Sequence, residues 1–208
     1  MFKALVVDDH PFIRSSVKML LKQEHFEVIA EADNGADAVQ LAREHSPDLI
    51  ILDIAMPKLD GLEVISRICA LNLKIRILVL TSQSALFYSM RCMKAGAAGF
   101  ISKTNDLDEL VKAIKAVMDG YNFFPNLATS SVRRSDVEAT DLELIQKLSD
   151  RELTILQQLS NGLSNKEIGD AMLLSNKTIS TYKTRLIEKL NVKSVVYLAD
   201  FAKRNNLI

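Results

Sequence analysis

The feature that most constrains this fold is an alternation, repeated five times before residue 120, of short apolar runs with longer stretches of helical period. Parallel strands need a long crossover between them, and that crossover is usually a helix. Five strand–helix units in succession therefore predict a parallel β-sheet with helices on both faces. We expect strands over residues 2–7, 27–30, 49–52, 75–80 and 99–102, and helices over residues 11–24, 35–45, 61–71, 86–95 and 107–119.

The second part of the chain carries a different pattern. The segment "GYNFFPNLATSSVRRSDVEAT" interrupts the periodicity with Gly, Pro and a Ser/Thr-rich run, which is typical of a linker. We place this linker at residues 123–145, between an α/β domain over 1–122 and a small all-α domain over 146–208. The aromatic start of the segment, residues 121–124, is expected to pack on the first domain. Short helices are expected over residues 150–160, 165–172, 176–190 and 194–205.

Membrane and secreted classes do not fit this sequence. No stretch of it approaches the roughly 20 apolar residues that cross a bilayer. The start "MFKALVVDDH" has too short an apolar run for a signal peptide. Cys69 and Cys92 lie alone in helical patterns, without metal-ligand spacing. We therefore expect a cytoplasmic protein with reduced thiols and no membrane insertion.

Polar and charged residues follow four of the expected strands. Asp8 and Asp9 follow the first strand, Asp53 the third, Thr81 the fourth and Lys103 the fifth. Ligands of open parallel sheets bind outside the carboxyl ends of the strands. Three carboxylates brought together there repel one another unless a cation neutralises them, and oxygen-only ligands suit Mg²⁺. Asp53 is then the expected nucleophile toward a phosphoryl group, whose oxygens the ammonium and the hydroxyl would bind.

These residues stand in the motifs "VVDDH", "IILDIAMPKLDGLEVI", "LVLTSQ" and "GAAGFISK", which resemble the receiver domain of two-component response regulators over residues 1–122. The resemblance implies a flavodoxin-like five-stranded parallel sheet with strand order two-one-three-four-five. It implies that Asp53 is the phosphoacceptor. Asp9, Asp53 and the backbone carbonyl of Ala55 would bind Mg²⁺ directly, and Asp8 would bind it through water.

The same resemblance implies a switch. Thr81 and Lys103 would hold the phosphoryl oxygens, and Phe100 matches the aromatic residue that turns inward when Thr81 moves toward the phosphate. A phosphoryl group adds a charge of about −1.5 to −2. We expect this charge to change the surface formed by the fourth and fifth helices and the fifth strand.

The all-α part contains a helix-turn-helix pattern in "SNKEIGDAMLLSNKTISTYKTRLIEKL". Ile179, Leu186 and Leu190 form one apolar stripe on the second helix, opposite a face of small polar and basic residues. Residues 148–208 hold 9 basic and 6 acidic side chains, a net charge of +3, in a chain whose total is zero. Such a face suits a helix that enters the major groove, although a solvated amphipathic helix carries the same pattern.

The stretch "LSDRELTILQQLSNGLSNKEIGDAMLLSNKTISTYKTRLIEKLNV" resembles the LuxR-type DNA-binding domain, over residues 146–208. With the receiver in front of it, the whole chain is similar to the NarL/FixJ family of regulators. Its motifs most resemble those of the BvgA/EvgA branch. The resemblance places base contacts at Ser180, Thr181 and Thr184, and lysines would contact phosphates. The full set of expected DNA-binding residues is Lys166, Asn176, Lys177, Thr178, Ser180, Thr181, Lys183, Thr184, Arg185 and Lys189.

One departure concerns the reading helix. Many relatives have Lys and His where this chain has Ser180 and Tyr182, and the central reading face holds no Arg, Asn or Gln for bidentate base contacts. We therefore predict modest discrimination by each half-site, with specificity gained from dimerisation and DNA shape.

The resemblance also implies partners. A sensor histidine kinase, membrane-bound and of the hybrid type in this branch, would supply the phosphoryl group in a phosphorelay. Phosphorylation would favour a homodimer that binds promoter DNA, with RNA polymerase as a candidate further partner. The dimer would use receiver helices and the last helix, where Val195, Leu198, Ala199 and Ala202 are apolar candidates.

Three other functions share parts of these patterns. Metal-dependent phosphatases with an Asp nucleophile commonly carry a second Asp two residues later, where this chain has Ala55. A dinucleotide enzyme would need a glycine-rich turn where this chain has "DDHPF". We expect no enzyme activity beyond phosphoryl transfer and hydrolysis at Asp53. A regulator that binds DNA independently of phosphate, with a purely structural acidic edge, stays open as the third alternative.

The histidines receive no catalytic role. His10 is expected to cap the turn into Pro11, because proline suits a first helical position. His25 and His45 lie near helix ends, where a cation is mildly favourable.

Overall fold

The structure is a computed structural model that describes residues 1–56, 58–104, 106–125 and 136–208. The chain divides into two compact units, Met1–Asn126 and Leu127–Ile208. Each unit has its own core, and each is described by itself below.

The first unit is built on a five-stranded parallel sheet, as the sequence predicts. The strand order is β2-β1-β3-β4-β5, which confirms the order that the family resemblance implies. In the register, Val7 of β1 lies beside Leu52 of β3, and Thr81 of β4 lies beside Ser102 of β5. The strands are β1 Phe2–Val7, β2 Phe26–Ala32, β3 Leu49–Leu52, β4 Arg76–Thr81 and β5 Gly99–Ser102.

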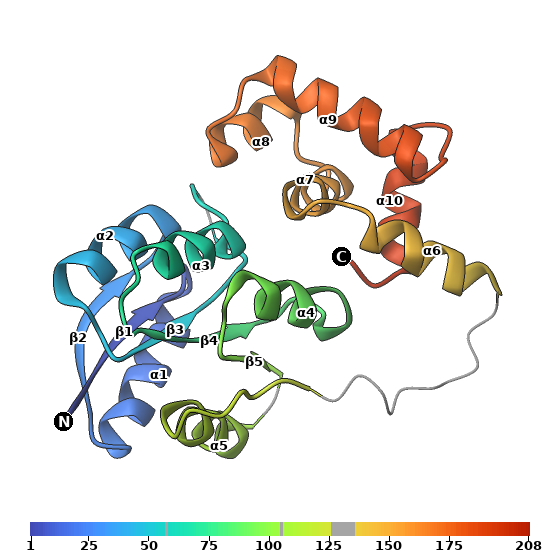
Figure 1. The fold of residues 1–208 in the computed structure, drawn as a ribbon. Helices are drawn as coiled ribbons and strands as arrows, with labels where there is room; N and C mark the ends of the chain where they lie inside the picture. Colours follow the sequence, from blue (N-terminus) through green and yellow to red (C-terminus); the bar gives the residue numbers. More distant parts are fainter. Residues whose placement is uncertain (57, 105, 126–135) are drawn as a thin grey trace. The chain divides into compact units, whose positions relative to one another are not determined.

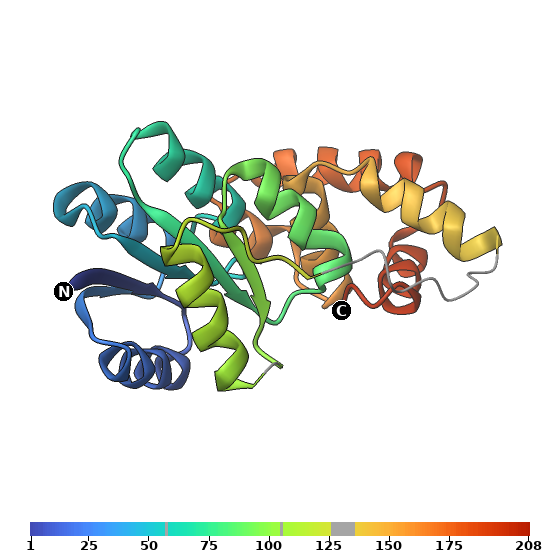
Figure 2. The same cartoon turned by 60° about the horizontal axis from the view of Figure 1, so that its bottom comes forward.

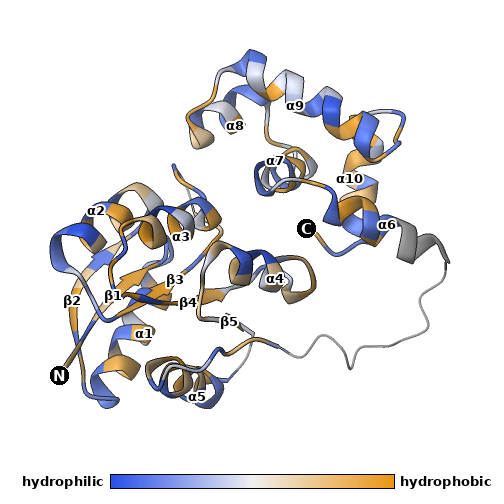
Figure 3. Ribbon diagram, viewed as in Figure 1, coloured by the Kyte–Doolittle hydropathy of each residue, from blue (hydrophilic) through white to orange (hydrophobic). Residues whose placement is uncertain are grey.

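Helices cover both faces of this sheet. Helices α1 and α5 lie on one face, and α2, α3 and α4 lie on the other (Figures 1 and 2). All four residues of β3 are buried because both faces of that strand are covered, which explains its uninterrupted apolar run. Figure 3 shows the hydrophobic character of the central strands. The helices are α1 Pro11–Gln23, α2 Gly35–His45, α3 Gly61–Ala70, α4 Ala85–Ala95 and α5 Leu107–Met118.

A close backbone approach shapes the loop that follows β3. A Cβ atom on Gly61 would lie 2.4 Å from the Cα of Ile54, so a larger residue would push the loop away from α3. The amide of Gly61 donates to the Ile54 carbonyl at 3.2 Å, and the Asp60 carboxylate caps α3 by accepting from the Leu62 amide at 2.7 Å. The loop after Asp53 is thereby closed tightly against the start of α3.

The second unit consists of helices. The capping boxes Ser149–Glu152 and Ser164–Glu167 start α7 and α8, and Phe201 of α10 is fully buried in its core. No helix among the described residues is long and apolar enough to cross a bilayer. The helices are α6 Asp136–Gln146, α7 Asp150–Ser160, α8 Asn165–Met172, α9 Asn176–Lys189 and α10 Val195–Arg204.

The linker prediction needs a correction, because α6 occupies its second half. Asp141 accepts from Arg204 Nε at 2.7 Å and from Asn205 Nδ2 at 3.0 Å, and Ile145 is fully buried. Burial by itself would raise the pKa of Asp141, but these two hydrogen bonds hold that pKa below its ordinary value. The helix therefore belongs to the second unit, and residues 126–135 of the predicted linker lie outside the described residues.

The aromatic start of that segment behaves as predicted in part. The Phe100 amide donates to the Phe123 carbonyl at 2.8 Å, and the Phe123 amide donates to the Ala98 carbonyl at 2.9 Å. Phe123 therefore extends the edge of the sheet beside β5. The prediction was wrong for Tyr121, whose side chain is exposed.

Candidate functional site

The sheet topology brings the residues that follow four strands to one edge. Asp53 follows the last residue of β3. Its amide donates to the carbonyl of Val7 at 2.8 Å, so Asp53 lies beside the end of the neighbouring strand β1. In the same way the Lys103 amide donates to the Thr81 carbonyl at 2.8 Å. The chain leaves β1 for β2 on one side and returns to β3 on the other, so this edge is the point where strand order reverses.

One ammonium bridges two buried carboxylates there. Lys103 Nζ lies 2.6 Å from Asp53 Oδ2 and 2.7 Å from Asp8 Oδ2, and these side chains are 12%, 1% and 4% exposed in that order. Burial by itself would lower the pKa of Lys103, but the hydrogen bonds to both carboxylates outweigh burial and raise it. In this arrangement Lys103 neutralises carboxylate charge that would otherwise be buried without a partner.

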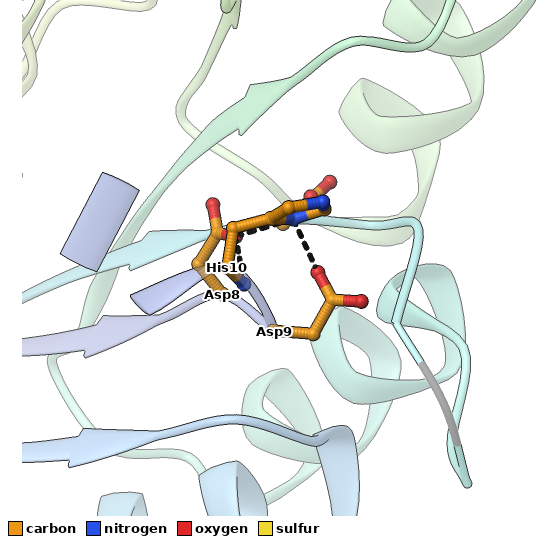
Figure 4. Close-up of side chains that lie close together, drawn as sticks. Asp8, Asp9 and His10 are labelled. Carbon is orange, nitrogen blue, oxygen red and sulfur yellow. Dashed lines mark hydrogen bonds and ion pairs between the residues drawn. The ribbon is translucent and has the colours of Figure 1, made fainter. Parts of the chain in front are cut away.

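The other oxygens of the two carboxylates face a different set of groups. Asp8 Oδ1 accepts from the His10 amide at 2.9 Å, and Asp53 Oδ1 accepts from the Ala55 amide at 3.0 Å. The ring atom His10 Nδ1 lies 2.7 Å from Asp9 Oδ1 and 3.3 Å from Asp8 Oδ1 (Figure 4). The cluster therefore has an Oδ2 side, which Lys103 occupies, and an Oδ1 side, which His10 and Asp9 occupy.

The Oδ1 side has the donor set of a cation site. One ligand atom each from Asp8, Asp9, His10 and Asp53 lies within 4.8 Å of all the others. Asp9 Oδ1 is buried and accepts no hydrogen bond from the described residues, although His10 is near it. A buried acceptor without a donor is costly, and a divalent cation would satisfy it. The residues present therefore fit a hard divalent cation.

Two expectations about neighbouring residues change. His10 stands at the N-cap of α1 before Pro11, as expected, but its side chain makes no capping hydrogen bond and faces the carboxylates instead. Phe100 is already buried in this structure, so it does not start from an exposed position from which it could turn inward. Thr81 is also buried, and its hydroxyl accepts from the Gln83 amide at 3.3 Å. A switching role for Phe100 and Thr81 stays a prediction.

Asp53 itself is more covered than a nucleophile at an open edge would be. The Lys103 ammonium is the group in direct contact with its Oδ2 atom. Lys103 also lines a pocket between α1 and α5, together with Val17 and Leu110. Access to Asp53 Oδ2 would require the Lys103 ammonium to move away from it.

A second candidate site lies on α9. Ile179 and Leu186 are fully buried and Leu190 nearly so, which confirms the predicted apolar stripe. The opposite face is exposed and hydrophilic, and Figure 3 shows blue segments along this helix. The exposed residues of the predicted set are Lys166, Asn176, Lys177, Ser180, Thr181, Thr184, Arg185 and Lys189, whereas Thr178 and Lys183 are half-buried.

The hydroxyl groups on the exposed face of α9 have defined partners. Thr181 Oγ1 donates to the Lys177 carbonyl at 3.1 Å, and Thr184 Oγ1 donates to the Ser180 carbonyl at 3.3 Å. Ser180 Oγ instead accepts from Asn165 Nδ2 at 3.0 Å. The sequence did not indicate Asn165, because this amide reaches the exposed face of α9 from α8 and no pattern along α9 reveals it.

Lys189 also has a partner that the sequence did not indicate. Its Nζ lies 2.8 Å from Glu152 Oε2 on α7, and the Glu152 side chain is 5% exposed. Burial by itself would raise the pKa of Glu152, but the hydrogen bonds from Lys189 and Ser149 hold that pKa below its ordinary value. Lys189 thus stabilises the packing of α9 on α7.

Comparison with known proteins identifies both domains. Residues 4–115 match the response regulator receiver domain, and residues 146–202 match the bacterial regulatory proteins of the luxR family. The virulence-factor transcription regulator BvgA of Bordetella pertussis is 54% identical over 205 residues, which cover 99% of this chain and 98% of that protein. The DNA-binding transcriptional activator EvgA of Escherichia coli is 34% identical over 204 residues, with 98% of each protein covered.

Solved structures show the same architecture. The receiver domain of NarL from Mycobacterium tuberculosis has a TM-score of 0.53 at 34% identity, over 57% of this chain and 97% of that one. The response regulator RcsB of Salmonella typhimurium has a TM-score of 0.75 at 24% identity, over 98% of both chains. The second likeness concerns the fold alone.

Proposed function

Because this chain belongs to the response regulators that join a receiver domain to a LuxR-type DNA-binding domain, we propose that phosphorylation of Asp53 controls its binding to promoter DNA. A sensor histidine kinase, membrane-bound and of the hybrid type, would be the phosphoryl donor. The observation that carries this proposal is the convergence of Asp8, Asp9, Asp53 and Lys103 at the switch point of the sheet. Its chemistry would be phosphoryl transfer to Asp53 and hydrolysis of the resulting acyl phosphate.

Magnesium fits the oxygen-rich side of the cluster. Asp9, Asp53 and the carbonyl of Ala55 would hold the ion directly, and Asp8 would hold it through water. When bound, Mg²⁺ supplies positive charge that neutralises the carboxylates and the incoming phosphoryl oxygens. The buried Asp9 Oδ1, which lies beside His10 Nδ1 but accepts no hydrogen bond from the described residues, supports this assignment.

The transfer step uses the groups around Asp53. A carboxylate oxygen of Asp53 attacks the phosphorus of a phosphohistidine, the P–N bond breaks, and its electron pair returns to the imidazole nitrogen of the donor. The Lys103 ammonium would leave Asp53 Oδ2 and pair with a phosphoryl oxygen. The Thr81 hydroxyl would donate to another phosphoryl oxygen. Movement of Thr81 would then change the packing around Phe100, and through it the surface of α4, β5 and α5.

The reading helix would present mixed hydrogen-bonding groups to DNA. The Thr181 and Thr184 hydroxyls donate their hydrogen bonds to the helix backbone. These side chains would therefore offer acceptor oxygens and methyl groups to the groove. Ser180 accepts from Asn165, so its own proton is available for an acceptor on a base edge. Lys166 and Lys177 would contact phosphates.

Dimerisation would add a second half-site. Of the apolar candidates on α10, Leu198 and Ala202 are fully buried in the core. Val196 and Tyr197 are the large apolar side chains that this helix exposes, at 71% and 51%. They are therefore better candidates for a surface that pairs two copies, and pairing two weak binding units raises overall affinity without new contacts to DNA.

The test is incubation of the full chain with Mg²⁺ and a small phosphodonor, followed by intact mass, light scattering and DNA-shift measurements. We expect one added phosphoryl group, a rise in mean mass and tighter DNA binding. Asp53→Asn should abolish all three changes, whereas Asp119→Asn, which alters an exposed carboxylate after α5, should abolish none. If Asp53→Asn binds promoter DNA as tightly as the phosphorylated parent does, the regulator acts independently of phosphate.

A further inference from the structure

We propose that His10 is a nitrogen ligand of the cation site, and that it lets the carboxylate cluster bind a transition ion such as Zn²⁺ or Co²⁺ in competition with Mg²⁺. This inference rests on the cation site of the proposed function and adds a residue to it. The imidazole turns an oxygen-only site into a mixed nitrogen and oxygen site.

The spacing of the atoms supports coordination by the ring. Two ligands at adjacent corners of an octahedral ion, with bonds of about 2.1 Å, lie about 3.0 Å apart. His10 Nδ1 lies 2.7 Å from Asp9 Oδ1 and 3.3 Å from Asp8 Oδ1, so its distances to both oxygens bracket that value (Figure 4). The ring nitrogen therefore lies at ligand spacing from two carboxylates, and the four ligand atoms of the cluster all lie within 4.8 Å of one another.

The two sides of the cluster allow an ion to enter beside the lysine. Lys103 contacts Oδ2 of Asp8 and Asp53, whereas His10 approaches Asp8 Oδ1 and Asp9 Oδ1. An ion on the Oδ1 side therefore does not need the atoms that Lys103 occupies. The buried Asp9 Oδ1, which accepts no hydrogen bond from the described residues, points to the same place. The His10 side chain is 66% exposed, so ions in solution can reach its ring.

Imidazole changes which ions the site prefers. Mg²⁺ favours oxygen ligands and near-ideal octahedral geometry, and it keeps several waters. Zn²⁺ and Co²⁺ bind imidazole nitrogen well and accept carboxylates in the same site. An added nitrogen ligand should therefore strengthen transition-ion binding and leave Mg²⁺ binding nearly unchanged.

The experiment measures two ions on the same variants. The full chain is titrated at pH 8 with Co²⁺, followed by visible absorption, and with Mg²⁺, followed by calorimetry. We expect His10→Ala to weaken Co²⁺ binding by at least about tenfold and to change Mg²⁺ binding by less than about twofold. His25→Ala and His45→Ala are the matched controls, because the chain has three histidines, and they should bind both ions as the parent does.

Two results would overturn the inference. One is Co²⁺ binding by His10→Ala with the affinity of the parent. The other is an equal loss of Co²⁺ and Mg²⁺ affinity, which would mean that His10 only supports the carboxylates. His10→Gln keeps a polar side chain of similar length and should lose Co²⁺ affinity as the alanine variant does. If the parent binds Co²⁺ through His10 but takes no phosphoryl group, the proposed function fails while this inference stands.

Discussion

Replacing Lys103 by alanine should destabilise the receiver unit by about 3 kcal/mol when divalent cations are removed. Its ammonium lies 2.6 Å and 2.7 Å from two carboxylates that are 1% and 4% exposed. Removing one partner of a buried ion pair costs roughly 3–5 kcal/mol, because the remaining charge stays buried. We take the lower end, since the Lys103 side chain is itself 12% exposed and water can replace part of it.

The assay is differential scanning calorimetry of the full chain in the presence of a chelator. A loss of about 3 kcal/mol lowers the transition of a unit of this size by roughly 10 °C. Lys115→Ala is the matched control, because Lys115 Nζ pairs with Glu24 Oε2 at 3.0 Å and these side chains are 62% and 25% exposed. An exposed pair contributes less than about 1 kcal/mol, so this control should melt within a few degrees of the parent.

Magnesium should rescue the variant selectively. The ion supplies the positive charge that the variant lacks, so Mg²⁺ should raise its transition temperature more than that of the parent. Ligand at about 100 times its Kd stabilises a native state by about 2.7 kcal/mol. Equal transition temperatures of variant and parent in chelator, or an equal response of both to Mg²⁺, would refute the reasoning.

The stabilisation of the parent by the Lys103 ion pair should also depend on pH. The pKa of Lys103 is raised above its ordinary value of 10.5 in the folded state. The stabilisation by this ion pair is therefore complete below about pH 10.5 and is lost as the pH rises through the raised pKa. Lys103→Ala should lack this alkaline component.

Four further changes separate binding from stability in the second unit. Lys177→Ala should weaken binding to all DNA sequences and lower the slope of log K against log salt by about one, as measured by fluorescence anisotropy. Lys189→Ala should leave that slope unchanged and lower the free energy of unfolding by about 1 kcal/mol. Asp141→Asn should remove a contribution to stability that is present above pH 3.8, the ordinary pKa of Asp141, and is lost as the pH falls through its lowered value; acid unfolding that matches the parent would contradict the pairing with Arg204. Asn165→Ala should broaden the base preference at one position in selection from a randomised DNA library, with little change in non-specific binding, and an unchanged preference would exclude its hydrogen bond to α9 from DNA reading.

Much of the first unit could be predicted from local patterns. β1, β3 and β5 have the predicted bounds, because most of their residues are apolar and buried. β2 is longer than predicted, since Phe26 and Ala32 at its ends pair with β1 although flanking polar residues obscure them. The polar residues after the strands also followed from the sequence, because parallel strands end at a common edge.

The misses share a cause. Helix α6 has a weak apolar pattern and is held by a pair between Asp141 and Arg204, which lie 63 residues apart. Lys189 pairs with Glu152, 37 residues earlier, and the sequence did not indicate this partner; a DNA contact by Lys189 stays a prediction. Asn165 reaches Ser180 from another helix. Periodicity reports which face of an element is buried, but it carries no information about which polar partner meets it there.

The amino-acid sequence by itself determined the two units, the parallel sheet and the five side chains at its edge, because these depend on short-range periodicity and on the rule that parallel strands share a direction. Only the tertiary structure decided which side-chain atoms contact one another at this edge. It placed Lys103 on the Oδ2 atoms of Asp8 and Asp53 and turned His10 toward Asp9. The physical reason is that hydrogen bonds and ion pairs act over about 3 Å between individual atoms, a distance that depends on side-chain rotamers and packing.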